Sequence, residues 1–256
     1  MLAVWGELRH FPRIGRLRRA FTFSTWTLTS HIAYAMGRLP WEDSRRSAGG
    51  QKRRLSDFRR WNVRLGVRGG SPFADTCDFQ TAVRSLGYSV QAVVSANPIG
   101  PETPFRHFAD SVVSVGKEGD CLLRICKLVP EDGLGFVMLN TCETHYPYYD
   151  GSYDDELTGS RYIAGYRGQV RAAARGVSVS LPSFSRAVRE RLFLRQCSAI
   201  KYVDSKLEAL LRKLPKGAFL TVTADHGDCF GEGGFVGHGE VADVKVLEVP
   251  LIEGRV

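Results

Sequence analysis

The sequence contains no long apolar run. No stretch reaches the roughly eighteen apolar residues that a helix needs to cross a bilayer, and arginines interrupt residues 1–20, where a signal peptide would need an apolar segment. We therefore expect a soluble, cytoplasmic protein that makes no membrane contact. The 256 residues, 43% of them hydrophobic, suffice to bury a full core, and we expect a single domain over residues 1–256.

Closely spaced cysteines are also missing. The six cysteines lie far apart, with no Cys-x-x-Cys pair and no histidine at zinc-finger spacing. This pattern argues against a disulfide framework and against a cysteine-based zinc site. We expect free, reduced thiols.

Negative charge is scarce in the first part of the chain. Residues 1–70 contain 15 Lys and Arg against 4 Asp and Glu, whereas the other 186 residues contain 20 against 23. Such a surplus can attract nucleic acid or another polyanion. No aromatic or glycine pattern of a nucleic-acid module accompanies it, so a solvated arginine-rich surface is the simpler interpretation. Within it, residues 42–72 predict a basic, exposed insertion or flap.

The remaining sequence alternates between helical and strand patterns. Helices are expected over residues 76–88 and between about 183 and 214. Residues 21–40 indicate a loop followed by a helix, with Thr27, Thr29 or Ser30 as its N-cap. This alternation predicts a mostly parallel sheet between helices, that is, an α/β fold. The expected strands cover residues 89–96, 111–115, 135–141, 218–224 and about 246–254.

Polar residues gather where two of these strands end. Asp225, His226 and Gly227 follow the strand at 218–224, and His145 follows the strand at 135–141. Ligands bind at the carboxyl ends of strands in open α/β sheets, and a carboxylate beside an imidazole suits a divalent cation. An Asp-His pair in an ordinary turn has the same spacing, so the pattern alone leaves both interpretations open.

Three segments, in order along the chain, resemble motifs of the alkaline phosphatase and sulfatase superfamily. The segment WTLTSH at 26–31 resembles the W-T-x-P-S-H form of its nucleophile motif, with Thr29 in place of the usual proline. The segment THYPYY at 144–149 resembles the H-x-P-Y segment that contacts the substrate anion, and TVTADHGDCFGEGGFVGHG at 221–239 resembles the C-terminal metal-site segment. The resemblance implies a three-layer α/β/α, alkaline-phosphatase-like fold.

The resemblance also assigns roles to individual residues. Thr27 falls on the nucleophile, Asp225 and His226 fall on metal ligands, and His145 and His238 fall on substrate-contacting positions. The implied cofactor is a divalent metal ion, and aspartate with histidine is compatible with Mn, Zn, Mg or Ca.

A metal-dependent hydrolase is the function that the resemblance implies. A threonine hydroxyl is a poor nucleophile at neutral pH, so it needs a cation that favours its alkoxide form. Imidazoles and a helix N-terminus would offset the charge on a transferred phosphoryl group. Sulfatases of the superfamily convert a Cys or Ser at this position to formylglycine, and Thr27 is not a known substrate for that conversion. A phosphoester is therefore the expected substrate, ahead of a sulfoester.

A second hypothesis is a catalytically inactive or truncated sulfatase-like domain that acts as a binding module, with a polyanion as its partner through the basic N-terminal region. In the superfamily a first strand ending in acidic metal ligands precedes the nucleophile motif, and Glu7 does not follow a recognisable strand here. We expect the sheet to be incomplete at both ends. Fewer charged ligands would weaken metal binding.

Several polar residues near these motifs receive other roles. His31 is expected to orient the nucleophile loop, and Asp204 in the long helix is expected to be structural. Glu143, Asp228 and Glu232 flank the predicted site and are expected to be solvated or to support the ligands rather than to bind metal.

Overall fold

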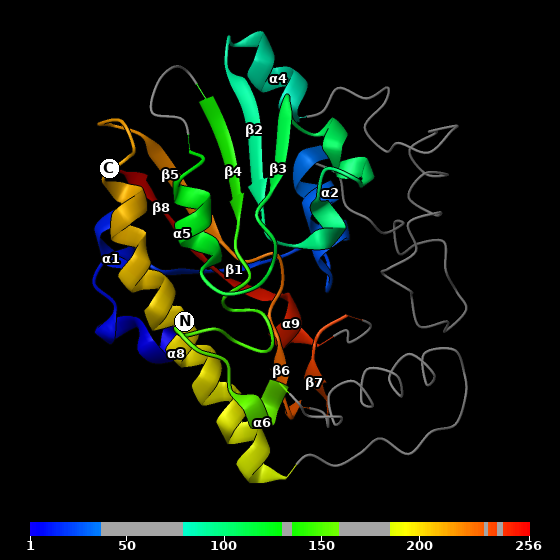
Figure 1. Cartoon of the computed structure of the whole chain (residues 1–256), viewed down its shortest axis with the longest axis vertical. Coiled ribbons are helices and arrows are strands. Elements are labelled where there is room, and N and C mark those ends of the chain that lie inside the picture. Colours follow the sequence, from blue (N-terminus) through cyan, green and yellow to red (C-terminus); the bar gives the residue numbers. More distant parts are fainter. Residues whose placement is uncertain (37–78, 130–134, 159–184, 233–234, 240–242) are drawn as a thin grey trace.

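The computed structural model describes residues 1–36, 79–129, 135–158, 185–232, 235–239 and 243–256. The predicted basic insertion at 42–72 lies outside these residues. Within the described helices, none is long and apolar enough to cross a membrane. Figure 1 shows the arrangement of the helices and strands.

A parallel three-stranded sheet forms around β2, Ser89–Val94. β3, Ser111–Ser114, and β4, Gly135–Asn140, flank it, and both run parallel to it. β2 is buried on both faces, because its residues 90, 92 and 94 face one cluster of apolar side chains while Val93 faces another. Continuous apolar character is typical of a parallel strand covered by helices on both sides.

A second three-stranded sheet is antiparallel. Its central strand is β8, Glu248–Arg255, which lies between β1, Arg18–Phe21, and β5, Phe219–Thr223. The parallel character predicted from the sequence therefore belongs to β3, β2 and β4, and the last strand reverses direction against β5. A third, two-stranded sheet pairs β6, Cys229–Phe230, with β7, Val236–Gly237.

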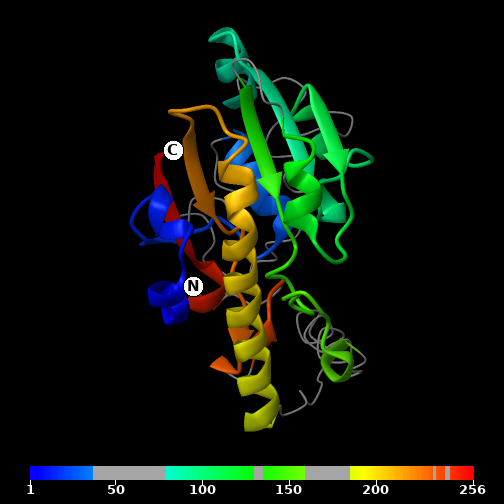
Figure 2. The same cartoon turned by 60° about the vertical axis from the view of Figure 1, so that its left-hand side comes forward.

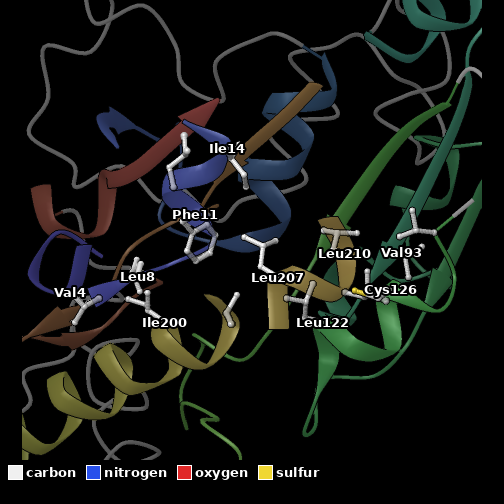
Figure 3. Close-up of a cluster of buried hydrophobic side chains, with 14 of the residues drawn as sticks. Val4, Leu8, Phe11, Ile14, Val93, Leu122, Cys126, Ile200, Leu207 and Leu210 are labelled. Atoms are coloured by element: carbon white, nitrogen blue, oxygen red, sulfur yellow. The ribbon is translucent and has the colours of Figure 1, made fainter. Parts of the chain in front are cut away.

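Helices cover both faces of the parallel sheet, which confirms the predicted three-layer α/β/α architecture. α5, Cys121–Cys126, and α8, Arg186–Leu211, pack against one face, whereas α2, Thr27–Met36, and α4, Phe79–Ser85, lie against the other. The core on the α5 and α8 side continues to β5 and β8, so a single apolar cluster joins the two sheets (Figure 3). The other short elements among the described residues are η1 Leu2–Glu7, α1 Phe11–Ile14, η3 Asn97–Ile99, η4 Pro104–His107, α6 Asp155–Thr158 and α9 Val244–Leu247.

The long helix α8 also holds the N-terminal segment in place, as the view in Figure 2 shows. Ser185 caps its start by accepting a hydrogen bond from the Val188 N–H at 3.2 Å. Further along, the buried Asp204 carboxylate accepts hydrogen bonds from the N–H groups of residues 9, 10 and 11 at 2.8, 3.0 and 2.8 Å. Asp204 thus satisfies backbone donors at the start of α1, which is the structural role expected for it.

Candidate functional site

The predicted site residues come together where β4, β5 and α2 end or begin. Asp225 and His226 directly follow β5, and Thr27 is the first residue of α2. Two contacts hold these segments side by side. The Thr22 hydroxyl donates to the Asp225 carbonyl at 2.7 Å, and the Gly239 N–H donates to the Thr25 carbonyl at 3.0 Å. The fold therefore joins segments about 200 residues apart in sequence into one site.

Thr27 lies beside the predicted metal ligands. Its side chain is buried, with 7% of the residue exposed, and its hydroxyl oxygen is 3.3 Å from Nε2 of His226. Thr27 is also near enough to Asp225 to lower the pKa of that carboxyl group. The predicted nucleophile therefore contacts His226 and lies near Asp225.

The tautomer of His226 follows from its other ring nitrogen. Nδ1 is 3.1 Å from the Gly227 carbonyl, so Nδ1 carries the proton and donates it. Burial lowers the pKa of His226, although the neighbouring Asp225 opposes this effect. A neutral ring with its lone pair on Nε2 is the form that binds a metal ion.

Asp225 is ionised despite its burial. Burial by itself would raise its pKa, but His226, His31 and the hydrogen bond from Thr27 outweigh that effect, and the pKa is lowered. His31 Nδ1 is 3.9 Å from the Asp225 carboxylate and 2.7 Å from the Thr27 carbonyl, to which it donates. His31 thus connects the start of α2 with Asp225, as expected for a residue that orients the nucleophile loop.

A second carboxylate and imidazole pair lies beside the first. His238 Nδ1 donates to Asp228 at 2.7 Å, and the Tyr148 hydroxyl donates to the other carboxylate oxygen at 3.1 Å. The His238 ring centroid is 3.9 Å from that of His226 and 5.1 Å from that of His145. Burial alone would raise the pKa of Asp228, but the hydrogen bond and the charge of His238 lower it. Asp228 therefore fixes the orientation of His238.

His145 lies beside the pair formed by Asp228 and His238. Burial lowers its pKa to about 4, and the nearby His238 adds to this effect. Its Nδ1 donates to the Tyr146 carbonyl at 2.6 Å, so Nε2 is the unprotonated nitrogen. Both predicted substrate-contacting histidines thus lie next to the predicted metal ligands.

Several side chains at the candidate site could act as ligands of a metal ion. Among the described residues, His226, Asp228 and His238 form one group whose potential ligand atoms all lie within 4.8 Å of one another, and the carboxylate of Asp225 is 3.6 Å from Nε2 of His226. Imidazole nitrogens with carboxylate oxygens are a donor set that fits a divalent ion such as Zn²⁺ or Mn²⁺. The group includes the predicted ligand His226 but not Asp225, and it adds Asp228 and His238 as candidate ligands.

The glycine of the Asp-His-Gly segment is required by close packing. A Cβ on Gly227 would lie 2.3 Å from the Lys245 carbonyl oxygen, and the Gly227 N–H donates to the Val246 carbonyl at 2.7 Å. The segment is therefore pressed against α9, which fixes the direction in which Asp225, His226 and Asp228 leave the backbone.

The other flanking acids support the loops. Glu143, only 1% exposed, accepts the Leu122 N–H at 2.6 Å and so ties the loop of His145 to α5. Burial raises the pKa of Glu143, partly offset by that hydrogen bond. Glu232 accepts the Phe230 N–H at 2.5 Å within its own turn. Neither acid belongs to the group of potential ligands among the described residues.

Asp228 has the supporting role expected from the sequence, since it orients His238. Sequence reasoning did not identify Thr22 or Tyr148. Thr22 and Tyr148 act through contacts between distant segments, which local patterns do not contain.

No protein-family model matches this sequence, and no curated relative matches it either. Solved structures do match its fold. The C-terminal periplasmic domain of phosphoethanolamine transferase EptC from Campylobacter jejuni superposes with a TM-score of 0.54 at 12% identity, covering 92% of this chain and 66% of that one. The soluble domain of lipooligosaccharide phosphoethanolamine transferase A from Neisseria meningitidis gives 0.53 at 13% identity, covering 99% and 68%. This chain shares the alkaline-phosphatase-like fold of these domains.

A third structure with this alkaline-phosphatase-like fold was solved with zinc. It is the periplasmic domain of EptC from Escherichia coli in complex with Zn, with a TM-score of 0.53 at 13% identity, covering 93% of this chain and 62% of that domain. The present chain thus spans about two thirds of the length of these alkaline-phosphatase-like domains. The fold class predicted from the three motifs is confirmed.

Proposed function

We propose that this chain transfers a phosphoryl group from a phosphoester to Thr27 and then to water, as a metal-dependent phosphohydrolase. The observation that carries the proposal is the position of the Thr27 hydroxyl, which is 3.3 Å from Nε2 of His226 and lies near Asp225. Resemblance in three motifs supports the same roles. The solved structures of similar fold are named as phosphoethanolamine transferases, which favours a phosphoester over a sulfoester.

The start of α2 would receive the substrate anion. The first-turn N–H groups of this ten-residue helix point toward its N-terminal end, where partial positive charge accumulates. Thr27 is the first helical residue, so its hydroxyl is at the end that attracts a phosphate. The contact with Nε2 of His226 restrains the Thr27 hydroxyl, and His31 fixes the Thr27 backbone carbonyl.

Asp225 and His226 would hold the divalent ion, with Asp228 and His238 next to them. Such an ion supplies positive charge that favours the alkoxide of the nucleophile and offsets charge on the phosphoryl oxygens. His238, oriented by Asp228 through Nδ1, would direct Nε2 toward the substrate, and His145 would do the same from the facing loop. Because Nδ1 carries the proton in a neutral ring held this way, each Nε2 would accept a hydrogen bond, from a protonated phosphate oxygen or from the attacking water.

Hydrolysis of nitrophenyl phosphate and bis-nitrophenyl phosphate by the purified chain tests the proposal. We expect turnover that requires added Mn²⁺ or Zn²⁺, disappears with chelator, and is lost in Thr27→Ala and in Asp225→Ala. Mass spectrometry of a rapidly quenched reaction should find phosphate on Thr27. If the folded chain neither turns over these esters nor takes up metal, the alternative hypothesis of a non-catalytic binding module replaces this one.

A further inference from the structure

Tyr148 has a backbone conformation that tyrosine rarely adopts. Its φ is +58°, in the left-handed region, where a bulky side chain is uncommon. Two hydrogen bonds hold this conformation: the Tyr148 N–H donates to the His145 carbonyl at 2.7 Å, and NH2 of Arg195 donates to the Tyr148 carbonyl at 3.2 Å. Residues that their surroundings hold in such conformations cluster at functional sites. The side chain of Tyr148 is therefore a candidate for a specific role.

Packing accounts for the ring of Tyr148 but not for its hydroxyl. The residue is 2% exposed, and its ring centroid lies 6.0 Å from that of Tyr146 and 6.2 Å from that of Phe230. A phenylalanine would make the same contacts, because they involve the ring alone. The hydroxyl has a separate partner, since it donates to Oδ2 of Asp228 at 3.1 Å. Its contribution must therefore lie at Asp228.

Asp228 is suited to two different roles. Its Oδ1 accepts a hydrogen bond from Nδ1 of His238 at 2.7 Å, so this oxygen orients the imidazole. The same carboxylate belongs to the group of potential metal ligands with His226 and His238, whose ligand atoms all lie within 4.8 Å of one another. Without the hydroxyl of Tyr148, Oδ2 would keep its lone pairs for a cation beside His226.

The same hydroxyl links the two histidines that are predicted to contact the substrate. Tyr148 is bonded through its N–H to the carbonyl of His145, and it reaches His238 through Asp228. The two imidazole rings, with centroids 5.1 Å apart, therefore belong to one hydrogen-bonded unit. This unit joins the loop that follows β4 to the segment that follows β5.

We propose that Tyr148 is a positioning residue that keeps Asp228 on His238 and away from the metal ion. Its hydroxyl occupies the oxygen that would otherwise turn to the cation. The cation is thereby left to Asp225 and His226, and His238 stays aligned for the phosphoester. This assignment rests on the proposed function for the cation and the substrate. It deepens that function, because it names the group that divides two similar aspartates between two tasks.

Isothermal titration of Mn²⁺ into the chelator-treated, dialysed chain tests the role of Tyr148 without any turnover. Mn²⁺ is the probe because it prefers oxygen ligands to thiols, and the chain contains free cysteines. In Tyr148→Phe, which keeps the ring, the freed carboxylate oxygen should bind the ion. We expect the dissociation constant to fall about tenfold, a size of effect typical of changes around a metal ion. A merely structural role would give the opposite sign, because a loosened site binds metal more weakly.

Two further variants locate the effect. Tyr148→Phe/Asp228→Asn should bind Mn²⁺ no more tightly than Asp228→Asn alone, because an amide lacks the charge that makes the freed oxygen a strong ligand. Tyr202→Phe is the matched control, since it removes a tyrosine hydroxyl that donates to the Asp120 carboxylate, outside the candidate site. Its Mn²⁺ affinity should equal that of the parent. Urea denaturation shows that each variant is folded.

Hydrolysis of nitrophenyl phosphate at saturating Mn²⁺ reports separately on the proposed function. A misaligned His238 should lower kcat/KM of Tyr148→Phe about tenfold or more, even though the metal is bound more tightly.

The role of Tyr148 would be overturned by an unchanged or higher Mn²⁺ dissociation constant in Tyr148→Phe, or by a fall that persists in the double variant or appears equally in Tyr202→Phe. Unchanged kcat/KM in an active chain would contradict the alignment of His238. A parent chain that binds Mn²⁺ but hydrolyses no ester would overturn the proposed function alone, and the titration would still decide the role of Tyr148. A parent chain that takes up no Mn²⁺ would overturn both.

Discussion

The two carboxylate and imidazole pairs of the 225–239 segment are chemically alike but differently engaged. Asp228 makes direct hydrogen bonds to His238 and Tyr148, so both its oxygens are occupied by groups of the protein. Asp225 is 3.6 Å from His226 and 3.9 Å from His31, beyond hydrogen-bond distance to either ring, and Thr27 lies nearby. Asp225 therefore retains oxygen lone pairs for a cation, whereas Asp228 uses its own to orient a histidine.

Asp225→Asn should give the largest effect, because it removes the negative charge from the pair with free acceptor capacity. A lost ligand is expected to cost several kcal/mol of transition-state stabilisation, or on the order of 10³-fold in turnover. Nitrophenyl phosphate hydrolysis and metal content after dialysis are the measurements. Glu232→Gln, in the same loop but engaged with the Phe230 N–H, is the control and should keep nearly full activity. Equal losses in the two variants would contradict the special role of Asp225.

Asp228→Asn should have a smaller effect. An asparagine can still accept the Nδ1–H of His238, so orientation is partly kept while the charge is lost. Loss of such a supporting partner typically costs 10- to 100-fold in metal affinity or activity, and metal titration together with kcat and KM would measure it. A loss as large as that of Asp225→Asn would mean that Asp228 is itself a principal ligand, as its place in the group with His226 and His238 allows.

The difference between the pairs illustrates what the sequence could predict. Asp225 and His226 stand out because they follow a strand whose alternation is clear, and β5 was found at Phe219–Thr223 against a predicted 218–224. Asp228 has no such signal, because its partners His238 and Tyr148 reach it only after the glycine-rich loop closes and β4 is placed. Contacts across the fold, rather than local pattern, decide which carboxylate is occupied.

For the fold too, local sequence pattern predicted some elements and missed others. β2, β4 and α8 were predicted to within a few residues, because β2 and β4 are runs of β-branched and other apolar residues and α8 has a clear 3.6-residue period. β1, Arg18–Phe21, was missed because a largely exposed, arginine-containing edge strand shows no apolar alternation. The antiparallel direction of β8 was also beyond local reasoning, because it depends on how the loop from Asp225 to α9 folds back.

A fall in pH should destabilise the folded protein through His145, whose ring lies beside His238 of the second pair. Its folded pKa is about 4 and its ordinary value is 6.5, so between these values the unfolded chain binds more protons than the folded chain. The free energy of unfolding should therefore decrease as the pH falls from 6.5 toward about 4. Urea unfolding at several pH values in this window is the measurement. His145→Gln should flatten the slope without abolishing it, since the lowered pKa of His226 acts in the same direction; an unchanged slope would contradict the burial of a neutral His145.

Thr22→Val should give the smallest effect and act only on the first pair. Valine keeps the shape of threonine but removes the hydroxyl that donates to the Asp225 carbonyl at 2.7 Å and contacts the Tyr34 hydroxyl at 2.9 Å. The cost in unfolding free energy should be about 1 kcal/mol, the usual net value of such a hydrogen bond, measured by urea denaturation. Thr22→Ser, which keeps the hydroxyl, is the matched control. Because the lost bond positions the backbone of Asp225, metal affinity should weaken in Thr22→Val and recover in Thr22→Ser. A stability loss with unchanged metal affinity would show that Thr22 only joins the two segments and does not position Asp225.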